Sequence, residues 1–205
     1  MYPIISTYIN NLTKEFNSIP KQRRSLLETI AQYIRKKQVL NKPINLIYIC
    51  THNSRRSHFG QVWAKVAANF YGIKNINSFS GGTQKTAFNI NAINALVRIG
   101  FKIQQQENNE NNIFNVFYDD FEAPCVCYSK VYDDLNNPQY DFAAILTCSD
   151  AEQNCPFSPE VELRVSTTYD DPKEYDNTVL QDIKYDERCK QIALETLYVF
   201  SQVNN

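Results

Sequence analysis

Cys50, Arg56 and Ser57 stand at a spacing that suits the binding of a tetrahedral oxyanion. A cysteine thiolate is a nucleophile, and the planar guanidinium of Arg56 can hold two oxygens of an anion with a fork that lysine lacks. Ser57 can hydrogen-bond the thiolate. The residues between them are Thr51, His52, Asn53, Ser54 and Arg55. Asn53 tolerates the left-handed backbone that a loop curling around an anion requires.

The elements on either side of these residues would form an anion-binding loop. Residues 44–49 are a mostly apolar run behind Pro43, as expected of a buried parallel strand. From Ser57 the apolar residues recur at helical spacing until Gly72. Ligands of open α/β sheets bind beyond the carboxyl ends of strands, and helix N-termini attract anions. The same field favours the thiolate form of Cys50.

The rest of the chain alternates between strand and helix patterns. The predicted elements are strands over 76–80, 142–147 and 161–165, and helices over 89–99 and 180–203. Such alternation predicts an α/β fold, with an open parallel sheet and helices on both of its faces. A chain of 205 residues can bury the core of one such domain.

Two segments fall outside this rhythm. Residues 1–43 contain a helix start at Ser18-Ile19-Pro20 and an apolar stripe behind it, which predicts a helical extension packed on the core. Residues 104–140 contain two strand-like runs, 113–118 and 125–132, which predict an inserted antiparallel hairpin. The catalytic domain would then span 44–205.

Composition and charge narrow the possible surroundings of the protein. No apolar run approaches the ~20 residues of a membrane span, and the start lacks the features of a secretory signal, so we expect a cytoplasmic protein with no membrane partner. Residues 1–43 carry eight Lys and Arg against two Glu, which leaves open a nucleic-acid-binding arm. The acidic stretch 107–134 offers an internal partner instead, so no nucleic acid is expected.

The order Cys-x5-Arg-Ser between a strand and a helix resembles the phosphate loop of low-molecular-weight protein tyrosine phosphatases and of the arsenate reductases that share their fold. Cys-Thr-His-Asn-Ser is particularly similar to the reductase branch. The resemblance implies a phosphotyrosine protein phosphatase I-like fold, Cys50 as nucleophile, and residues 51–57 as the oxyanion-binding loop. It implies arsenate or a phosphate ester as substrate and no cofactor. No metal-ligand spacing links the histidines to the cysteines, so no metal is expected either.

A general acid would protonate the oxygen that leaves the substrate. Tyr169-Asp170-Asp171-Pro172 is similar to the acid loop of both families, which assigns the role to Asp171 rather than Asp170. Phosphatases of this class usually have an aromatic residue after Asp-Pro, whereas this chain has Lys173.

Cys148 and Cys155 resemble the shuttle pair of arsenate reductases that depend on thioredoxin, and typical phosphatases lack such a pair. The resemblance implies that Cys148 attacks the Cys50 adduct, that Cys155 attacks Cys148, and that thioredoxin reduces the resulting disulfide. On an intact helix, residues seven apart lie ~10 Å from each other, beyond the ~7 Å limit of a disulfide. The intervening segment must therefore unwind when the pair oxidises.

Three functions remain open on this sequence. A thioredoxin-coupled arsenate reductase is favoured, a low-molecular-weight phosphatase acting through Cys50, Arg56 and Asp171 is the alternative, and a phosphate-binding module without catalysis is the third. The remaining candidates are assigned structural roles. His52 would shape the loop, His58 would lie on the helix surface, and Arg55 would add charge at the pocket rim. We expect Cys125, Cys127 and Cys189 to serve packing.

Overall fold

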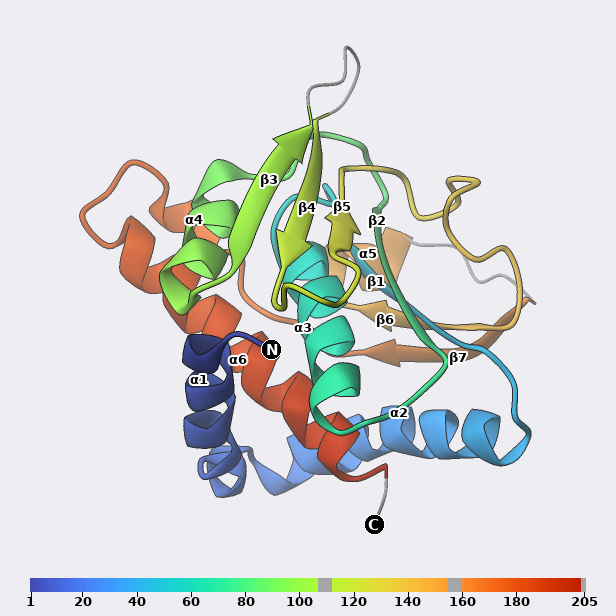
Figure 1. Cartoon of the computed structure of the whole chain (residues 1–205). Helices are drawn as coiled ribbons and strands as arrows, with labels where there is room; N and C mark the ends of the chain where they lie inside the picture. Colours follow the sequence, from blue (N-terminus) through green and yellow to red (C-terminus); the bar gives the residue numbers. More distant parts are fainter. Residues whose placement is uncertain (107–111, 155–159, 204–205) are drawn as a thin grey trace.

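A four-stranded parallel sheet forms the centre of the molecule (Figure 1). The computed structural model describes residues 1–106, 112–154 and 160–203. Across the sheet the strands are β2 (Ile76–Gly82), β1 (Ile44–Cys50), β6 (Phe142–Leu146) and β7 (Val161–Ser166). All three neighbouring pairs are parallel. The predicted α/β class with a parallel sheet is therefore confirmed.

The position of β1 explains where the candidate loop lies. It is a central strand, since β2 pairs with one of its edges and β6 with the other. Its apolar side chains are buried because alternate residues enter the two cores on opposite faces of the sheet. The chain runs from β1 outward to β2 and later returns to the other side at β6, so the strand order reverses beside β1. The crevice at such a switch point is the usual ligand site of open α/β sheets, and Cys50 ends β1 there.

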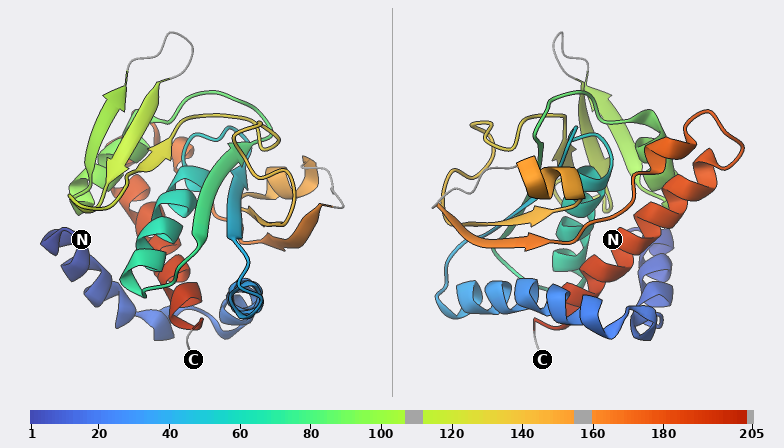
Figure 2. Two further views of the ribbon diagram at one scale, coloured as in Figure 1. Left: turned by 45° about the vertical axis from the view of Figure 1, so that its right-hand side comes forward. Right: turned by 180° about the vertical axis from the view of Figure 1, so that it is seen from behind.

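Helices flank the sheet unequally. One face is covered by α3 (Arg56–Phe70) and α6 (Gln181–Ser201), whose buried side chains, such as Trp63 and Phe200, form the main core with residues of β1 and β6. The short α5 (Ser149–Asn154) packs on the opposite face. The smaller core there includes Ile49 and Leu146 together with Cys50 and Cys148. Figure 2 shows α6 crossing behind the strands.

The first forty residues form three helical segments, α1 (Pro3–Thr13), η1 (Phe16–Ser18) and α2 (Lys21–Val39). Helix α2 begins after Pro20, as predicted, whereas α1 was not predicted because only three of its residues are buried. Both α1 and α2 pack against α6 (Figure 2). The division between a helical extension and a catalytic domain at residue 43 stays a prediction.

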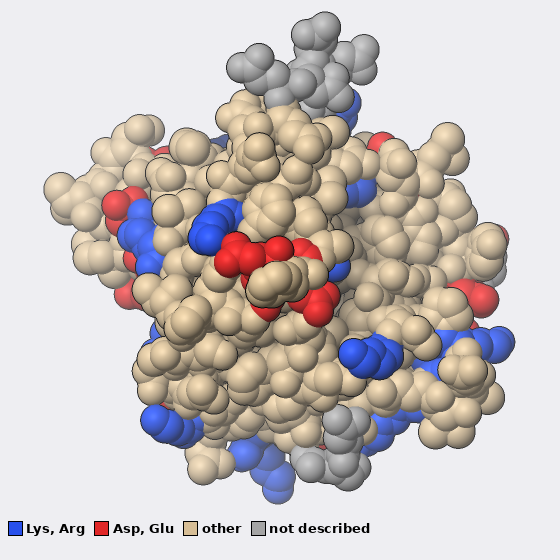
Figure 3. All heavy atoms as spheres, in the orientation of Figure 1, with Lys and Arg blue, Asp and Glu red and all other residues tan. Residues whose placement is uncertain are grey.

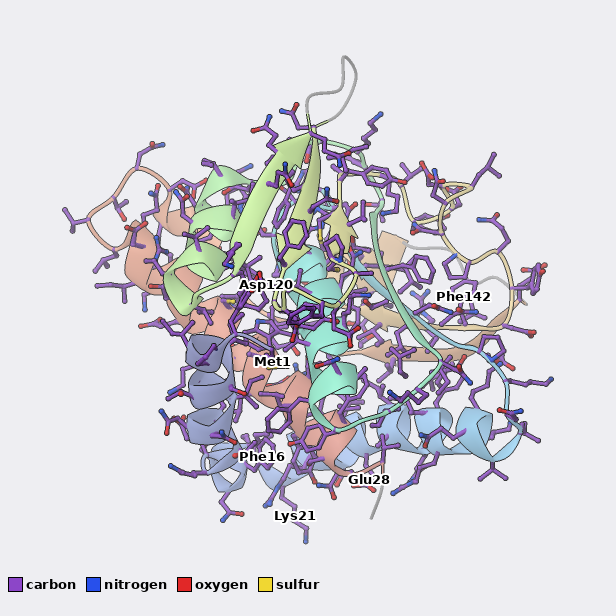
Figure 4. All side chains as sticks on the ribbon, in the orientation of Figure 1. Met1, Phe16, Lys21, Glu28, Asp120 and Phe142 are labelled. Atoms are coloured by element: carbon purple, nitrogen blue, oxygen red, sulfur yellow. The ribbon has the colours of Figure 1, made fainter. Side chains whose placement is uncertain are left out.

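Among the described residues, no basic side chain of residues 1–43 forms an ion pair with the acidic stretch. Lys37 is buried and binds Glu162 on β7 at 2.7 Å, and Arg23 binds Glu195 on α6 at 2.8 Å. Two residues of the acidic stretch instead bind the N-terminus. Asp119 pairs with the amino group of Met1, and Asp120 accepts a hydrogen bond from the hydroxyl of Tyr2. Acidic side chains gather near the centre of the face in Figure 3, where Figure 4 labels Asp120.

A second sheet replaces the predicted hairpin. Its antiparallel strands are β3 (Lys102–Gln106), β4 (Ile113–Phe117) and β5 (Cys125–Cys127). The prediction missed β3, whose glutamines lack an apolar alternation, and it placed the end of the last strand five residues too late. Helix α4 (Ile90–Ile99) leads into β3 through Gly100, whose φ of 113° ends the helix in the left-handed region.

The closing helix α6 begins at Gln181 and runs without a break to Ser201. Within the part of the chain that the structure describes, no helix is long and apolar enough to cross a membrane.

Candidate active site

The predicted loop curls between the end of β1 and the first turn of α3. Cys50 is buried, and its Sγ lies 3.1 Å from the Oγ of Ser57. Asn53 adopts the left-handed backbone that its residue type tolerates, with a φ of 43°. Its Nδ2 donates to the Oγ of Ser57 at 2.9 Å. The side chains of Asn53 and Ser57 thus fix the curl of the loop around the sulfur.

The carbonyl groups of the loop are held by the segment that follows β2. Four of these carbonyls accept hydrogen bonds: Cys50 from Thr83 N (3.1 Å), Thr51 from Gln84 N (2.8 Å), His52 from Thr86 Oγ1 (2.8 Å) and Ser54 from Asn89 N (3.0 Å). These bonds engage carbonyl oxygens, whereas an anion site uses the backbone N–H groups of a loop that leads into a helix N-terminus. The loop is therefore a candidate anion site.

The end of β2 and the segment after β5 also pack against the loop. A side chain at Gly82 would place its Cβ 2.6 Å from the backbone N of Asn53, so only glycine allows this approach. The backbone N of Lys130 donates to the Oδ1 of Asn53 at 2.8 Å, and the Oγ of Ser129 donates to the carbonyl of His52 at 3.2 Å. Sequence reasoning missed this support, although Gly81-Gly82 at a strand end was a signal for a close approach.

Arg56 and Asp171 meet at the open side of the loop. The Nη2 of Arg56 pairs with Asp171, and its Nη1 donates to the carbonyl of Tyr169 at 2.8 Å. The Nε of Arg56 is buried and has no partner among the residues that the structure describes. Asp171 also caps η2 (Pro172–Tyr175) by accepting from Lys173 N. Asp170 points elsewhere, since its side chain is 91% exposed and pairs with Arg188.

Cys148 lies next to the loop, directly after β6. Its Sγ is 3.4 Å from the Oγ1 of Thr51, and the backbone N of Ala151 also approaches it at 3.4 Å. The hydroxyl of Thr51 donates to Asp150 at 2.8 Å. Both Cys50 and Cys148 are buried in the smaller core. Cys155 lies outside the described residues.

Relatives and solved structures agree on one group of proteins. No family model matches the chain. "Arsenate reductase 2" of Staphylococcus haemolyticus (strain JCSC1435) is 28% identical over 130 residues, which cover 62% of this chain and 77% of that protein. The fold is similar to that of a low-molecular-weight phosphotyrosine phosphatase from Vibrio cholerae O395, with a TM-score of 0.52, 15% identity, and coverage of 79% of this chain and 97% of that one. This chain is thus similar in sequence to an arsenate reductase and shares the fold of low-molecular-weight phosphatases and arsenate reductases.

A second solved structure has the same fold. It is an arsenate reductase in its phosphate-binding state, with a TM-score of 0.52 and 15% identity. It covers 78% of this chain and 98% of its own. At such identities the structures establish the fold, and the choice between a reductase and a phosphatase activity has to come from the site.

Arg55 does not add free charge at the rim, as the sequence had suggested. It is buried, its Nε donates to the hydroxyl of Tyr185 at 2.7 Å, and its Nη2 pairs with Asp176 at 3.3 Å. The hydroxyl of Tyr185 donates to Asp176 at 2.7 Å. Arg55 therefore ties the loop to the segment after η2 and to α6 through its guanidinium.

His58 is buried rather than exposed, so the surface assignment was wrong. Its Nδ1 lies 3.2 Å from the Oγ of Ser80, and its ring packs on Phe88 with 4.1 Å between centroids. Burial and the nearby charge of Lys130 lower the pKa of His58 to about 3. The imidazole is therefore neutral and belongs to the support of the loop. A helical period alone could not show which face of α3 is covered by β2 and by Phe88.

A hollow of about 230 Å³ opens beside the loop. It is lined by His52, Ser54, Arg55, Thr86, Ala87, Asn89 and Lys173. Lys173 stands where low-molecular-weight phosphatases usually have an aromatic residue. Within the described ranges, no three His, Cys, Asp or Glu side chains come together as a metal site requires.

The three remaining cysteines are buried away from the loop. Cys189 accepts a hydrogen bond from the Nε1 of Trp63 at 3.4 Å, and burial raises its pKa to about 12. This inert thiol fits the packing role predicted for it. Cys125 and Cys127 share one side of β5, with their sulfurs 3.9 Å apart, while Val126 between them is partly exposed.

Proposed function

We propose that the chain is an arsenate reductase in which Cys50 attacks arsenate and Cys148 and Cys155 remove the resulting oxidising equivalents. The observation that carries the proposal is the position of Cys148, whose Sγ lies 3.4 Å from Thr51 of the loop. Hydrolysis of a phosphate ester needs no second thiol, whereas reduction of arsenate does. The match to an arsenate reductase in sequence supports the same choice.

The first step uses the groups around the loop. Arsenate is held by the loop N–H groups and by Arg56, whose unpartnered Nε is one donor available to it. The Cys50 thiolate attacks the arsenic, so an As–S bond forms and an As–O bond breaks. Asp171 supplies the proton with which the departing oxygen leaves as water. The positive end of α3 and Arg56 stabilise the charge on the remaining oxygens.

The second step reduces the arsenic. The Cys148 thiolate attacks the sulfur of Cys50, and a disulfide forms while the S–As bonding electrons stay on the arsenic. Two thiolates thereby supply two electrons, and the arsenic leaves in its trivalent form as arsenite. The shared buried cluster of Cys50 and Cys148 supports this reach.

The third step regenerates the nucleophile. Cys155 attacks Cys148, releases Cys50 as a thiolate, and leaves a Cys148–Cys155 disulfide for thioredoxin to reduce by exchange. Helix α5 has only six residues, and Ser149 and Asp150 at its start are weak helix formers. Such a short helix has a low cost of opening, which the formation of this disulfide requires.

The proposal is tested by trapping the intermediates of this thiol sequence. The full chain is incubated with arsenate in the absence of reductant, and its disulfides are mapped by mass spectrometry. The wild type should accumulate the Cys148–Cys155 disulfide, and Cys155→Ser should stop at Cys50–Cys148 because the last attacker is missing. Cys189→Ser is the matched control, since it removes a buried thiol away from the loop, and it should behave as the wild type does. More than one turnover should require thioredoxin.

The alternative activity, that of a phosphatase, gives a different result. A low-molecular-weight phosphatase would use Cys50, Arg56 and Asp171 in the same first step, after which water would release the phosphate. If arsenate produces no disulfide, while hydrolysis of an aryl phosphate is efficient and survives Cys148→Ser, the reductase proposal is wrong.

A further inference from the structure

Cys125 and Cys127 form a pair of thiols that the proposed reaction does not use. Both are buried, and they project from the same side of β5 into the main core. Cys50 and Cys148 belong to the smaller core on the opposite face of the parallel sheet. The pair is therefore a separate cluster of nucleophiles.

A hollow of about 390 Å³ lies on one side of the pair. Cys125 faces this hollow, together with Lys130, Lys65, Ser78 and Tyr128. Lys130 is itself buried, and its ammonium lies 4.2 Å from the centre of the Tyr128 ring. Cys127 lies deeper, with its Sγ 3.8 Å from the Oε1 of Gln61 on α3. A small ligand in the hollow would thus meet Cys125 first and Lys130 beside it.

The spacing of the two sulfurs suits a single thiophilic centre. The Sγ atoms of Cys125 and Cys127 are 3.9 Å apart. Two thiolates on one tetrahedral zinc ion, each at ~2.3 Å, would lie ~3.8 Å from each other. A structural zinc site needs four protein ligands, and no third His, Cys, Asp or Glu joins the pair among the described residues. A centre that needs only two sulfurs fits the cluster better than zinc does.

We propose that Cys125 and Cys127 bind trivalent arsenic as arsenous acid, the product of the proposed reduction. The two cysteines take no part in the proposed reduction. Only the choice of arsenous acid as the ligand rests on the proposed function. Two As–S bonds form and two As–O bonds break, and each departing hydroxyl takes one thiol proton and leaves as water. No oxidation state changes. The third hydroxyl stays on the arsenic, where the ammonium of Lys130 can donate to it.

The residues that follow Cys127 in the chain connect the proposed arsenic site to the oxyanion loop. Two residues after Cys127, the Oγ of Ser129 donates to the carbonyl of His52, and the next residue, Lys130, donates its backbone N–H to Asn53. Arsenite at β5 is therefore held beside the segment that shapes the oxyanion loop.

The test first removes the three cysteines that the proposed reaction uses. Cys50, Cys148 and Cys155 are all changed to Ser in the full chain, which is reduced with a phosphine and dialysed against arsenite, and bound arsenic is measured by elemental mass spectrometry. We expect about one arsenic per chain, as one two-thiol site requires. Adding Cys125→Ser or Cys127→Ser should lower the affinity at least ~100-fold, because chelation is lost. Cys189→Ser should change nothing.

Two outcomes would overturn the site: no arsenic on the triple variant, or undiminished binding in both added variants. Circular dichroism shows whether each variant is folded. If a Ser variant does not fold, Cys125→Ala or Cys127→Ala is measured in its place. The triple variant cannot reduce arsenate, so this result is independent of the disulfide mapping that tests the proposed function.

Discussion

Arg56 at the start of α3 and Asp171 before η2 form an ion pair although 115 residues separate them in sequence. The second terminal nitrogen of Arg56 donates to the carbonyl of Tyr169, so the acid loop holds the guanidinium from two sides. An oxyanion that enters the loop has to share or displace the Asp171 carboxylate. The proposed acid and the proposed anion clamp are therefore coupled before substrate arrives.

Asp171→Asn should separate these two roles. The rate of arsenate reduction in a single turnover should fall by ~10²–10⁴, because the departing oxygen loses its proton donor. The dissociation constant for phosphate, a non-reducible analogue of arsenate, should stay equal or decrease, because a neutral amide competes less for Arg56. Rapid-quench kinetics and calorimetric titration measure the two quantities.

Asp170→Asn is the matched control for that change. It removes one carboxylate from the adjacent position, which is exposed and pairs with Arg188. Both the rate and the phosphate affinity should stay within about twofold of the wild type, as for most surface substitutions. A large loss of rate in Asp170→Asn with none in Asp171→Asn would show that the acid has been assigned to the wrong residue.

Arg56→Lys tests whether the planar fork is required. Lysine keeps the charge but cannot bind the Tyr169 carbonyl, Asp171 and an oxyanion together. We expect the rate to fall by ~10²–10³, as for the loss of one donor to a developing oxyanion, with weaker phosphate binding. Arg98→Lys, at a largely exposed ion pair with Asp186, should leave both quantities unchanged. Equal activity of Arg56→Lys and the wild type would contradict the clamp.

The geometry of the loop could be predicted from the sequence because it is local. Strand, cysteine, arginine and helix follow one another within residues 44–72, so spacing alone placed Cys50 and Arg56. The supports of the loop could not be predicted in this way. Gly82 and Ser129 reach it from distant parts of the chain, and their approach depends on how β2 and β5 pack.

Contacts between distant parts of the chain also explain why the predictions for two residues near the loop were wrong. Arg55 was expected at the rim because a charged residue in a loop is usually exposed, but Asp176 and Tyr185 from the C-terminal part of the chain enclose it. His58 was expected on the surface because the helix pattern did not show that β2 and Phe88 cover it. Both depend on contacts between residues far apart in sequence.

Tyr185→Phe should weaken the tie between the loop and α6. The change removes the hydroxyl that accepts from Arg55 and donates to Asp176, so a buried guanidinium nitrogen loses its partner. We expect the free energy of unfolding to fall by ~1–3 kcal/mol, measured by urea denaturation. Tyr140→Phe removes a hydroxyl from an exposed ring and should change it by less than about 0.5 kcal/mol. Equal effects of the two changes would mean that the hydroxyl of Tyr185 adds nothing to the tie.

The buried His58 should make stability depend on pH between neutrality and mild acid. Burial lowers its pKa from 6.5 to about 3, so the folded chain keeps the ring neutral while the unfolded chain protonates it below pH 6.5. The unfolded state then binds more protons, and the stability that His58 contributes is lost as the pH falls from 6.5 towards 3. Between pH 7 and pH 5 the loss from this one group is about 2 kcal/mol. Ser80, Gln61, Phe88 and Lys130 surround the ring, and none of them supplies a carboxylate that would stabilise the charged form.

His58→Gln isolates this contribution, because a glutamine side chain is polar but does not titrate. The free energy of unfolding is measured by urea denaturation at several pH values from 7 to 5 for the wild type, His58→Gln and the control His52→Gln. The variant at 58 is expected to be less stable than the wild type at pH 7, and the gap should shrink by about 2 kcal/mol at pH 5. His52→Gln is the control because it changes a histidine that is only partly buried on the loop. Parallel curves for the wild type and His58→Gln would show that the ring is not held neutral in the fold.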